Sequence, residues 1–147
     1  MNLDGDPQRA SELCREAHVR VVARVAQLTD ADARAASLLP GWTVGHVLTH
    51  LARNADSHAR RMSGALDGLD LPKYVGGSKQ REAEIESGAG RPPDELVADL
   101  EASELRLEQV FDRYITAGRP TATSSADQTT ECGRARLTGC ARSRCTM

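Results

Sequence analysis

Aromatic side chains are scarce in this chain of 147 residues, at only 3% of the total. A hydrophobic core must therefore be built from Leu, Val, Ala and Ile, which suits helices better than a β-sandwich. The chain is 39% hydrophobic and 27% charged, a balance typical of a globular protein, and its length corresponds to about one domain. We therefore predict an all-α domain.

Long apolar runs and an excess of one charge are also missing. No run approaches the roughly 18 residues that a membrane span needs, and the polar, acidic start of the chain is unlike a signal peptide. The formal net charge is −2, which gives no reason to expect a polyanionic partner. We expect a cytoplasmic protein with reduced thiols, no membrane partner and no nucleic-acid partner.

The four cysteines lack the spacing of a zinc knuckle. Cys14 lies in a helical pattern and is predicted to be a small buried residue. The other three, Cys132, Cys140 and Cys145, follow residue 130 and form no CxxC pair, so a zinc site made of these thiols is disfavoured.

Helix signals are strong before residue 117. Asp6 and Pro7 predict the start of a first helix, and Thr29 or Asp30 can cap a short turn. Thr43 is expected to cap a second long helix that ends near Gly64. A short third helix over residues 79–87 is predicted after a Ser78 cap, and a fourth is predicted from near Pro93 to residue 115.

Apolar residues at helical spacing mark the faces that these helices bury. In the second helix they are Val44, Val47, Leu48, Leu51, Ala55 and Met62. His58 falls within this stripe, which predicts a hydrogen-bonded core histidine. In the fourth helix the inner face is predicted to contain Leu96, Val97, Leu100, Leu107, Val110, Phe111, Tyr114 and Ile115.

Two histidines four residues apart, His46 and His50, lie on one face of the predicted second helix. Such a pair can bind one zinc ion, as in HExxH helices, but no Glu between them could serve as a base. The same spacing also arises by chance on a helix surface. A catalytic zinc site needs three protein ligands, and no histidine follows His58.

Two stretches of the sequence resemble a known family. They are "LPGWTVGHVLTHLARNAD" (residues 39–56) and "KYVGGSKQREAEIESGAGRPPDELVADL" (residues 73–100). Both resemble the mycothiol-dependent maleylpyruvate isomerase family, whose N-terminal metal-binding domain is a DinB-like four-helix bundle. The resemblance covers about residues 7–117, which implies a DinB-like domain over residues 1–117.

The resemblance implies a divalent metal, zinc, held by three protein ligands. His50 matches the histidine ligand that follows the Gly-Trp-Thr turn, with His46 as a secondary candidate. The other two ligands, a Glu and a His one turn apart, are expected after residue 117. The sequence has no such pair there, and Glu131 is isolated. A rearranged site, in which His46 and His50 bind metal with a tail cysteine, remains an alternative.

The implied chemistry uses mycothiol as a thiol cosubstrate and a small electrophilic molecule as substrate. In this family, thiol addition permits cis–trans isomerisation of maleylpyruvate to fumarylpyruvate, and related members transfer the thiol to other electrophiles. The resemblance therefore implies an isomerase or thiol transferase, although two of its expected ligands are missing here.

Composition changes abruptly after residue 117. Residues 118–147 are dominated by Ser, Thr, Arg and Cys, and Leu137 is their only large aliphatic residue. We predict a disordered tail, and we interpret it as a frameshift or truncation that replaces the last helix and removes a further C-terminal domain. The chain would then be impaired, with self-association through exposed apolar faces. The alternatives are a non-catalytic helical interaction module and an inactive fragment.

Overall fold

The computed structural model describes residues 6–117, which fold into five helices in chain order. These are α1 (Pro7–Val25), α2 (Asp30–Arg34), α3 (Val44–Leu66), α4 (Gly77–Ala89) and α5 (Pro93–Ala117). The prediction of an all-α, DinB-like helical fold is confirmed. The predicted tail of residues 118–147 lies outside the described residues.

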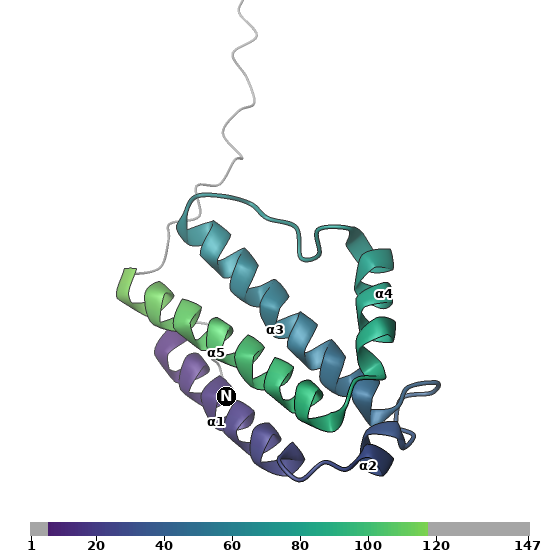
Figure 1. The fold of residues 1–147 in the computed structure, drawn as a ribbon. Helices are drawn as coiled ribbons and strands as arrows, with labels where there is room; N and C mark the ends of the chain where they lie inside the picture. Colours follow the sequence, from purple (N-terminus) through teal and green to yellow (C-terminus); the bar gives the residue numbers. More distant parts are fainter. Residues whose placement is uncertain (1–5, 118–147) are drawn as a thin grey trace, which may run out of the picture.

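The three long helices lie side by side, with α5 between α1 and α3 (Figure 1). Helix α4 crosses the N-terminal half of α3, where α2 also packs. One core cluster joins Leu48 and Ala52 of α3 to Leu96 and Leu100 of α5. A second joins Ala55 and Ala59 of α3 to Leu107 and Val110 of α5. Helix α5 is therefore the central element of the described part of the chain.

Most helix starts agree with their predicted caps. Asp6 accepts a hydrogen bond from the Arg9 N–H, Thr29 caps α2, and Thr43 caps α3. The predicted Ser78 cap is wrong: α4 begins at Gly77, two residues before the predicted start, with Gly76 as N-cap and no side-chain cap bond. Gly77 has a φ of +71°, a conformation that glycine adopts without strain, and this turn starts the helix before Ser78.

The buried face of α3 is rotated from the predicted stripe. Leu51 is 37% exposed and His58 is exposed, so the prediction of a core histidine is wrong. The buried face instead carries many small residues, including Ala52, Ala55 and Ala59. Small side chains let α5 approach closely, and this steric advantage outweighs the greater hydrophobicity of Leu51.

Two glycines allow α3 and α4 to pack closely. A β-carbon on Gly45 would lie 2.3 Å from the carbonyl oxygen of Ala89, and one on Gly88 would lie 2.5 Å from Cγ2 of Thr49. Any larger residue at either position would force the helices apart. Gly45 belongs to the Gly-Trp-Thr-Val-Gly-His string, so part of that motif sets helix packing.

Candidate functional site

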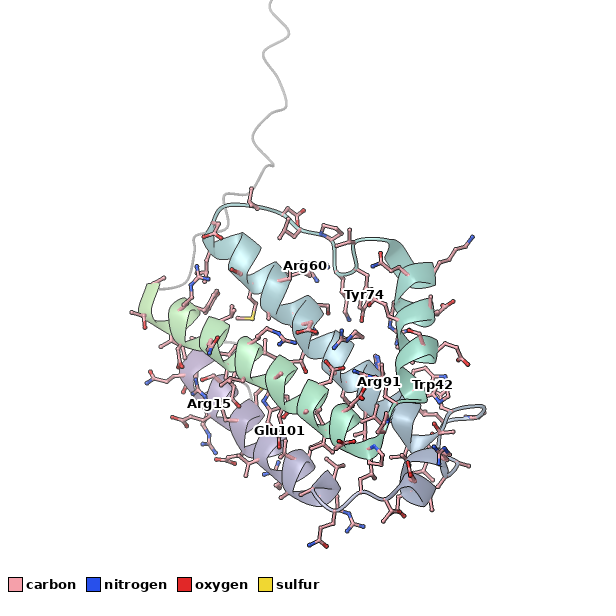
Figure 2. All side chains as sticks on the ribbon, viewed as in Figure 1. Arg15, Trp42, Arg60, Tyr74, Arg91 and Glu101 are labelled. Atoms are coloured by element: carbon pink, nitrogen blue, oxygen red, sulfur yellow. The ribbon has the colours of Figure 1, made fainter. Side chains whose placement is uncertain are left out.

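The candidate site is centred on Trp42 and the first two turns of α3. The indole stacks on the His46 ring, with centroids 6.0 Å apart. It also meets His50 edge-on at 5.6 Å. Figure 2 shows Trp42 beside the end of α3 that α4 crosses. The only tryptophan of the chain therefore contacts both histidines of the predicted pair.

His46 has hydrogen-bonding partners for both ring nitrogens. Its Nδ1 lies 3.1 Å from the backbone nitrogen of Thr43 and 2.8 Å from Thr43 Oγ1. Because the backbone N–H can only donate, Nδ1 is an acceptor and the proton resides on Nε2. That Nε2 lies 3.2 Å from the carboxylate of Glu86. His46 thus completes a capping box at the start of α3, in the place that Glu or Gln usually takes.

His50 is half-buried and contacts a cation. Its Nδ1 accepts a hydrogen bond from Nη2 of Arg81, a distance of 3.1 Å. Burial lowers the pKa of His50 below its usual 6.5, and the charges of Arg81 and Lys73 lower it further. His50 is therefore neutral at pH 7, with the proton on Nε2.

A neutral imidazole is the form that binds a metal, but residues 6–117 alone do not fit a metal ion. They contain no group of three His, Cys, Asp or Glu side chains placed to hold one. In addition, a metal at Nδ1 of His50 would have to displace the Arg81 guanidinium. The structure brings His46 and His50 around Trp42 but gives them different partners.

A network of charged hydrogen bonds joins α3, α4 and α5 beside this site. Asp99 of α5 accepts from Nη2 of Arg53 at 2.5 Å and from Nη2 of Arg91 at 2.6 Å. Because Arg53 comes from α3 and Arg91 directly follows α4, one carboxylate fixes the junction of three helices. Charge-assisted bonds of this kind are stronger than neutral ones.

Sequence reasoning missed the basic residues around the site. Arg53, Lys73 and Arg81 are scattered over two helices and a connecting segment, and no spacing rule pairs Arg81 with a histidine 31 residues earlier. Only the crossing of α4 over α3 brings them together. In the sequence, Arg53 and Asn54 resemble part of an ordinary polar helix face, so nothing marked Arg53 as a site residue.

Together, a helical domain and a histidine helix that follows a Gly-Trp-Thr turn define a DinB-like bundle domain. The sequence matches the family described as "Mycothiol maleylpyruvate isomerase N-terminal domain" over residues 14–141. The chain belongs to this family. No helix among the described residues is long and apolar enough to cross a membrane.

Solved structures support the assignment. The crystal structure of the mycothiol-dependent maleylpyruvate isomerase is 29% identical to this chain, with a TM-score of 0.68. That of a histidine-to-alanine mutant of the isomerase is 28% identical, also with a TM-score of 0.68. Each alignment covers 72% of this chain but only 44% of the solved one. No significant match to a curated protein was found.

Proposed function

We propose that this chain is part of a thiol-dependent isomerase that acts on maleylpyruvate, or of an enzyme that transfers the same thiol to a related electrophile. The observation that carries the proposal is the neutral His50, which sits on the motif helix beside Trp42 and Arg81. The thiol is that of mycothiol, which supplies a nucleophile that adds reversibly to the cis double bond and so permits rotation.

The residues around His50 have identifiable tasks in this proposal. Arg81 and Lys73 produce a positive field, since both charges lower the His50 pKa. Such a field attracts an anionic substrate and favours a thiolate over a thiol. Trp42 covers one side of His50 and restricts the orientation of its ring.

His50 is also proposed to be the histidine that this chain contributes to a zinc site. Zinc would act as a Lewis acid and lower the pKa of a bound thiol. The two further ligands that such a site requires are expected after residue 117, because residues 6–117 hold no group of three possible ligands, but no histidine follows His58 in the sequence. We therefore expect zinc binding and activity to be impaired in this chain.

Zinc content and isomerase activity test the proposal directly. The full chain is purified, loaded with zinc and dialysed, and its metal content is compared with those of His50→Ala and His58→Ala. We expect less than one zinc per chain, a further loss in His50→Ala and no change in His58→Ala, because His58 is an exposed residue of the same helix. Unchanged metal content in His50→Ala would refute the ligand assignment. One tightly bound zinc with full activity would refute the impairment.

The end of the chain needs a separate test. The composition changes after residue 117, whereas the family match continues to residue 141. Resequencing the codons for residues 110–147 decides between a frame error and a genuine segment. A corrected frame that encodes an amphipathic helix with Glu-x-x-x-His would supply the two ligands; a confirmed frame would favour an inactive fragment or an interaction module.

A non-catalytic role as an interaction module is the second candidate. An apolar hollow between the start of α1 and the end of α5 is lined by Cys14, Met62, Phe111 and Ile115, among others. A second copy of the chain could cover this surface, because exposed apolar hollows favour association. Light scattering across a concentration series tests this role, and a monomer at every concentration would exclude self-association.

A further inference from the structure

The connection between α3 and α4 forms one wall of a cavity of about 180 Å³. Lys73, Tyr74 and Val75 line the cavity from this connection, and residues of α3 and α4 form the other walls. Figure 2 shows Arg60 and Tyr74 in the region between the two helices. One wall of the cavity is therefore irregular backbone, which can move without the unfolding of a helix.

The first half of this connection is anchored on α3, but the second half is held less firmly. Leu71 packs so closely on Gly64 that a β-carbon there would lie 2.7 Å from Leu71 Cδ1. Within residues 6–117, no backbone N–H of residues 73–76 donates a hydrogen bond to another backbone group. The side chain of Val75 is 73% exposed. Residues 72–76 are thus the part of the connection that can open most easily.

Two glycines at the start of α4 supply a hinge for this segment. Gly77 has a φ of +71°, and no atom lies within 4 Å of a β-carbon placed there. Gly76 is the N-cap and makes no side-chain cap bond. Because glycine adopts positive and negative φ with similar ease, the backbone can turn here while the rest of α4 stays intact.

A single side chain ties the segment to α3. Nη2 of Arg60 donates to the carbonyl oxygen of Pro72 at 2.5 Å and to that of Lys73. No other hydrogen bond joins residues 72–76 to α3 in the part of the chain that the structure describes. Hydrogen bonds from a charged donor are stronger than neutral ones, so the observed position of the segment depends on Arg60.

The segment also contacts the histidine site through Arg81. The guanidinium carbon of Arg81 lies 5.8 Å from the centroid of the Tyr74 ring, within the range of a cation–π attraction. The same guanidinium donates to Nδ1 of His50 at 3.1 Å. A movement of Tyr74 therefore changes the surroundings of the group that contacts His50.

We propose that residues 72–76 form a flap, hinged at the glycines that begin α4 and latched by Arg60, which opens and closes over the cavity. In the closed state Tyr74 lies against Arg81, and in the open state Arg81 and the cavity walls face solvent. The movement rests on the geometry alone. Only its consequence, that opening admits a ligand to the histidine site, rests on the proposed function.

Cleavage of the full chain by a lysine-specific endoproteinase tests the flap. The chain has two lysines, Lys73 in the flap and Lys79 in α4. The protease must bind the carbonyl oxygen of the bond that it cuts, and the Lys73 carbonyl is one of the two that Arg60 holds. A first cut after Lys73 therefore reports flap opening, and a first cut after Lys79 reports unwinding of α4. The fragment masses distinguish the two.

Arg60→Gln should accelerate the first cut after Lys73 about tenfold, the effect expected for the loss of one charged hydrogen bond. The rate of the first cut after Lys79 should not change. Arg61→Gln is the matched control, because Arg61 neighbours Arg60 in α3 but is exposed and lies outside the cavity. An unchanged rate at Lys73 in Arg60→Gln would overturn the latch, as would an equal acceleration in Arg61→Gln. Equal acceleration at both lysines would overturn the flap.

A second measurement uses the unaltered chain and holds even if Arg60→Gln unfolds. Rates are measured in low concentrations of urea, relative to the cleavage of an unstructured peptide. Opening of a short flap exposes little surface, so the rate at Lys73 should hardly change, whereas the rate at Lys79 should rise. A parallel rise at both lysines would overturn the flap.

Neither measurement uses zinc, thiol or substrate. A failure of the flap therefore leaves the proposed function standing. A latched flap in a chain without isomerase activity supports the inference and counts only against the proposed function.

Discussion

Gly45 in the first turn of α3 lies so close to Ala89 at the end of α4 that a β-carbon on it would approach the Ala89 carbonyl oxygen to 2.3 Å. This contact sets the distance between the histidine helix and the helix that carries Arg81. The backbone oxygen cannot move aside as a flexible side chain could.

Gly45→Ala is therefore expected to destabilise the fold by about 1–3 kcal/mol, the usual cost of overpacking, although Ala is the better helix former. Urea unfolding followed by circular dichroism measures the change. Gly90→Ala is the control, because nothing lies within 4 Å of a β-carbon there and its φ of −86° suits any residue. Equal effects of the two substitutions would contradict the packing argument.

The capping role of His46 gives a second prediction. His46→Ala removes the acceptor for the Thr43 N–H and should lower stability by about 1 kcal/mol. Thr43→Ala removes the other half of the same capping box, so the double variant should lose less than the sum of the two single losses. Thermal unfolding of the three variants measures this coupling, and strictly additive losses would show that the two residues act separately.

The fluorescence of Trp42 should report the charge of His50. Protonated imidazole quenches a neighbouring indole, and the ring of His50 is 5.6 Å from that of Trp42. Because burial, Arg81 and Lys73 lower the pKa of His50, the quenching contributed by His50 should have its midpoint below pH 6.5. Arg81→Gln removes a positive charge and should move that midpoint upward.

Two controls identify the group responsible for the quenching. His50→Gln should abolish this component of the titration. Arg61→Gln should leave its midpoint in place, because Arg61 is an exposed residue of α3 and is not among the charges that lower the pKa of His50. The free energy of unfolding should depend on the same protonation. The folded state disfavours protonated His50, whereas His50 in the unfolded chain takes up a proton near pH 6.5. The stability that neutral His50 contributes is therefore complete above pH 6.5 and falls as the pH drops below 6.5. A midpoint at or above 6.5 in the unaltered chain would contradict the assignment.

A buried acid on α5 gives the last prediction. Burial raises the pKa of Glu104, the neighbouring Glu108 and Glu101 raise it further, and His18 opposes them. The folded state therefore holds this proton more tightly than the unfolded state, and stability falls as the pH rises from about 4.5 through the raised pKa.

Glu104→Gln should remove that loss and increase stability at pH 7 by about 1 kcal/mol or less, because it replaces a buried charge with a neutral group of the same size. The advantage should disappear near pH 4, where Glu104 is protonated. Urea unfolding at both pH values measures it, with the exposed Glu82→Gln as control. A loss of stability at pH 7 would show that the charge of Glu104 stabilises the fold, for example through its attraction to His18.

The sequence by itself determined the helices, their order and the family. Caps such as Thr43 and first-turn residues such as Pro93 act within a few residues of the chain, so the local sequence is enough to predict them. The motif around Trp42 was enough to make His50 a candidate metal ligand without any knowledge of its spatial neighbours. The metal ligand roles of His50 and His46 remain predictions, as does the tail after residue 117.

Only the tertiary structure decided which faces are buried and what surrounds the histidines. The exposure of His58 and Leu51 follows from how α5 packs on small residues, a steric outcome that hydrophobic periodicity does not rank. Arg81 reaches His50 because α4 crosses α3 at Gly45 and Gly88. Contacts between residues far apart in sequence depend on that crossing, and no local pattern of residues encodes it.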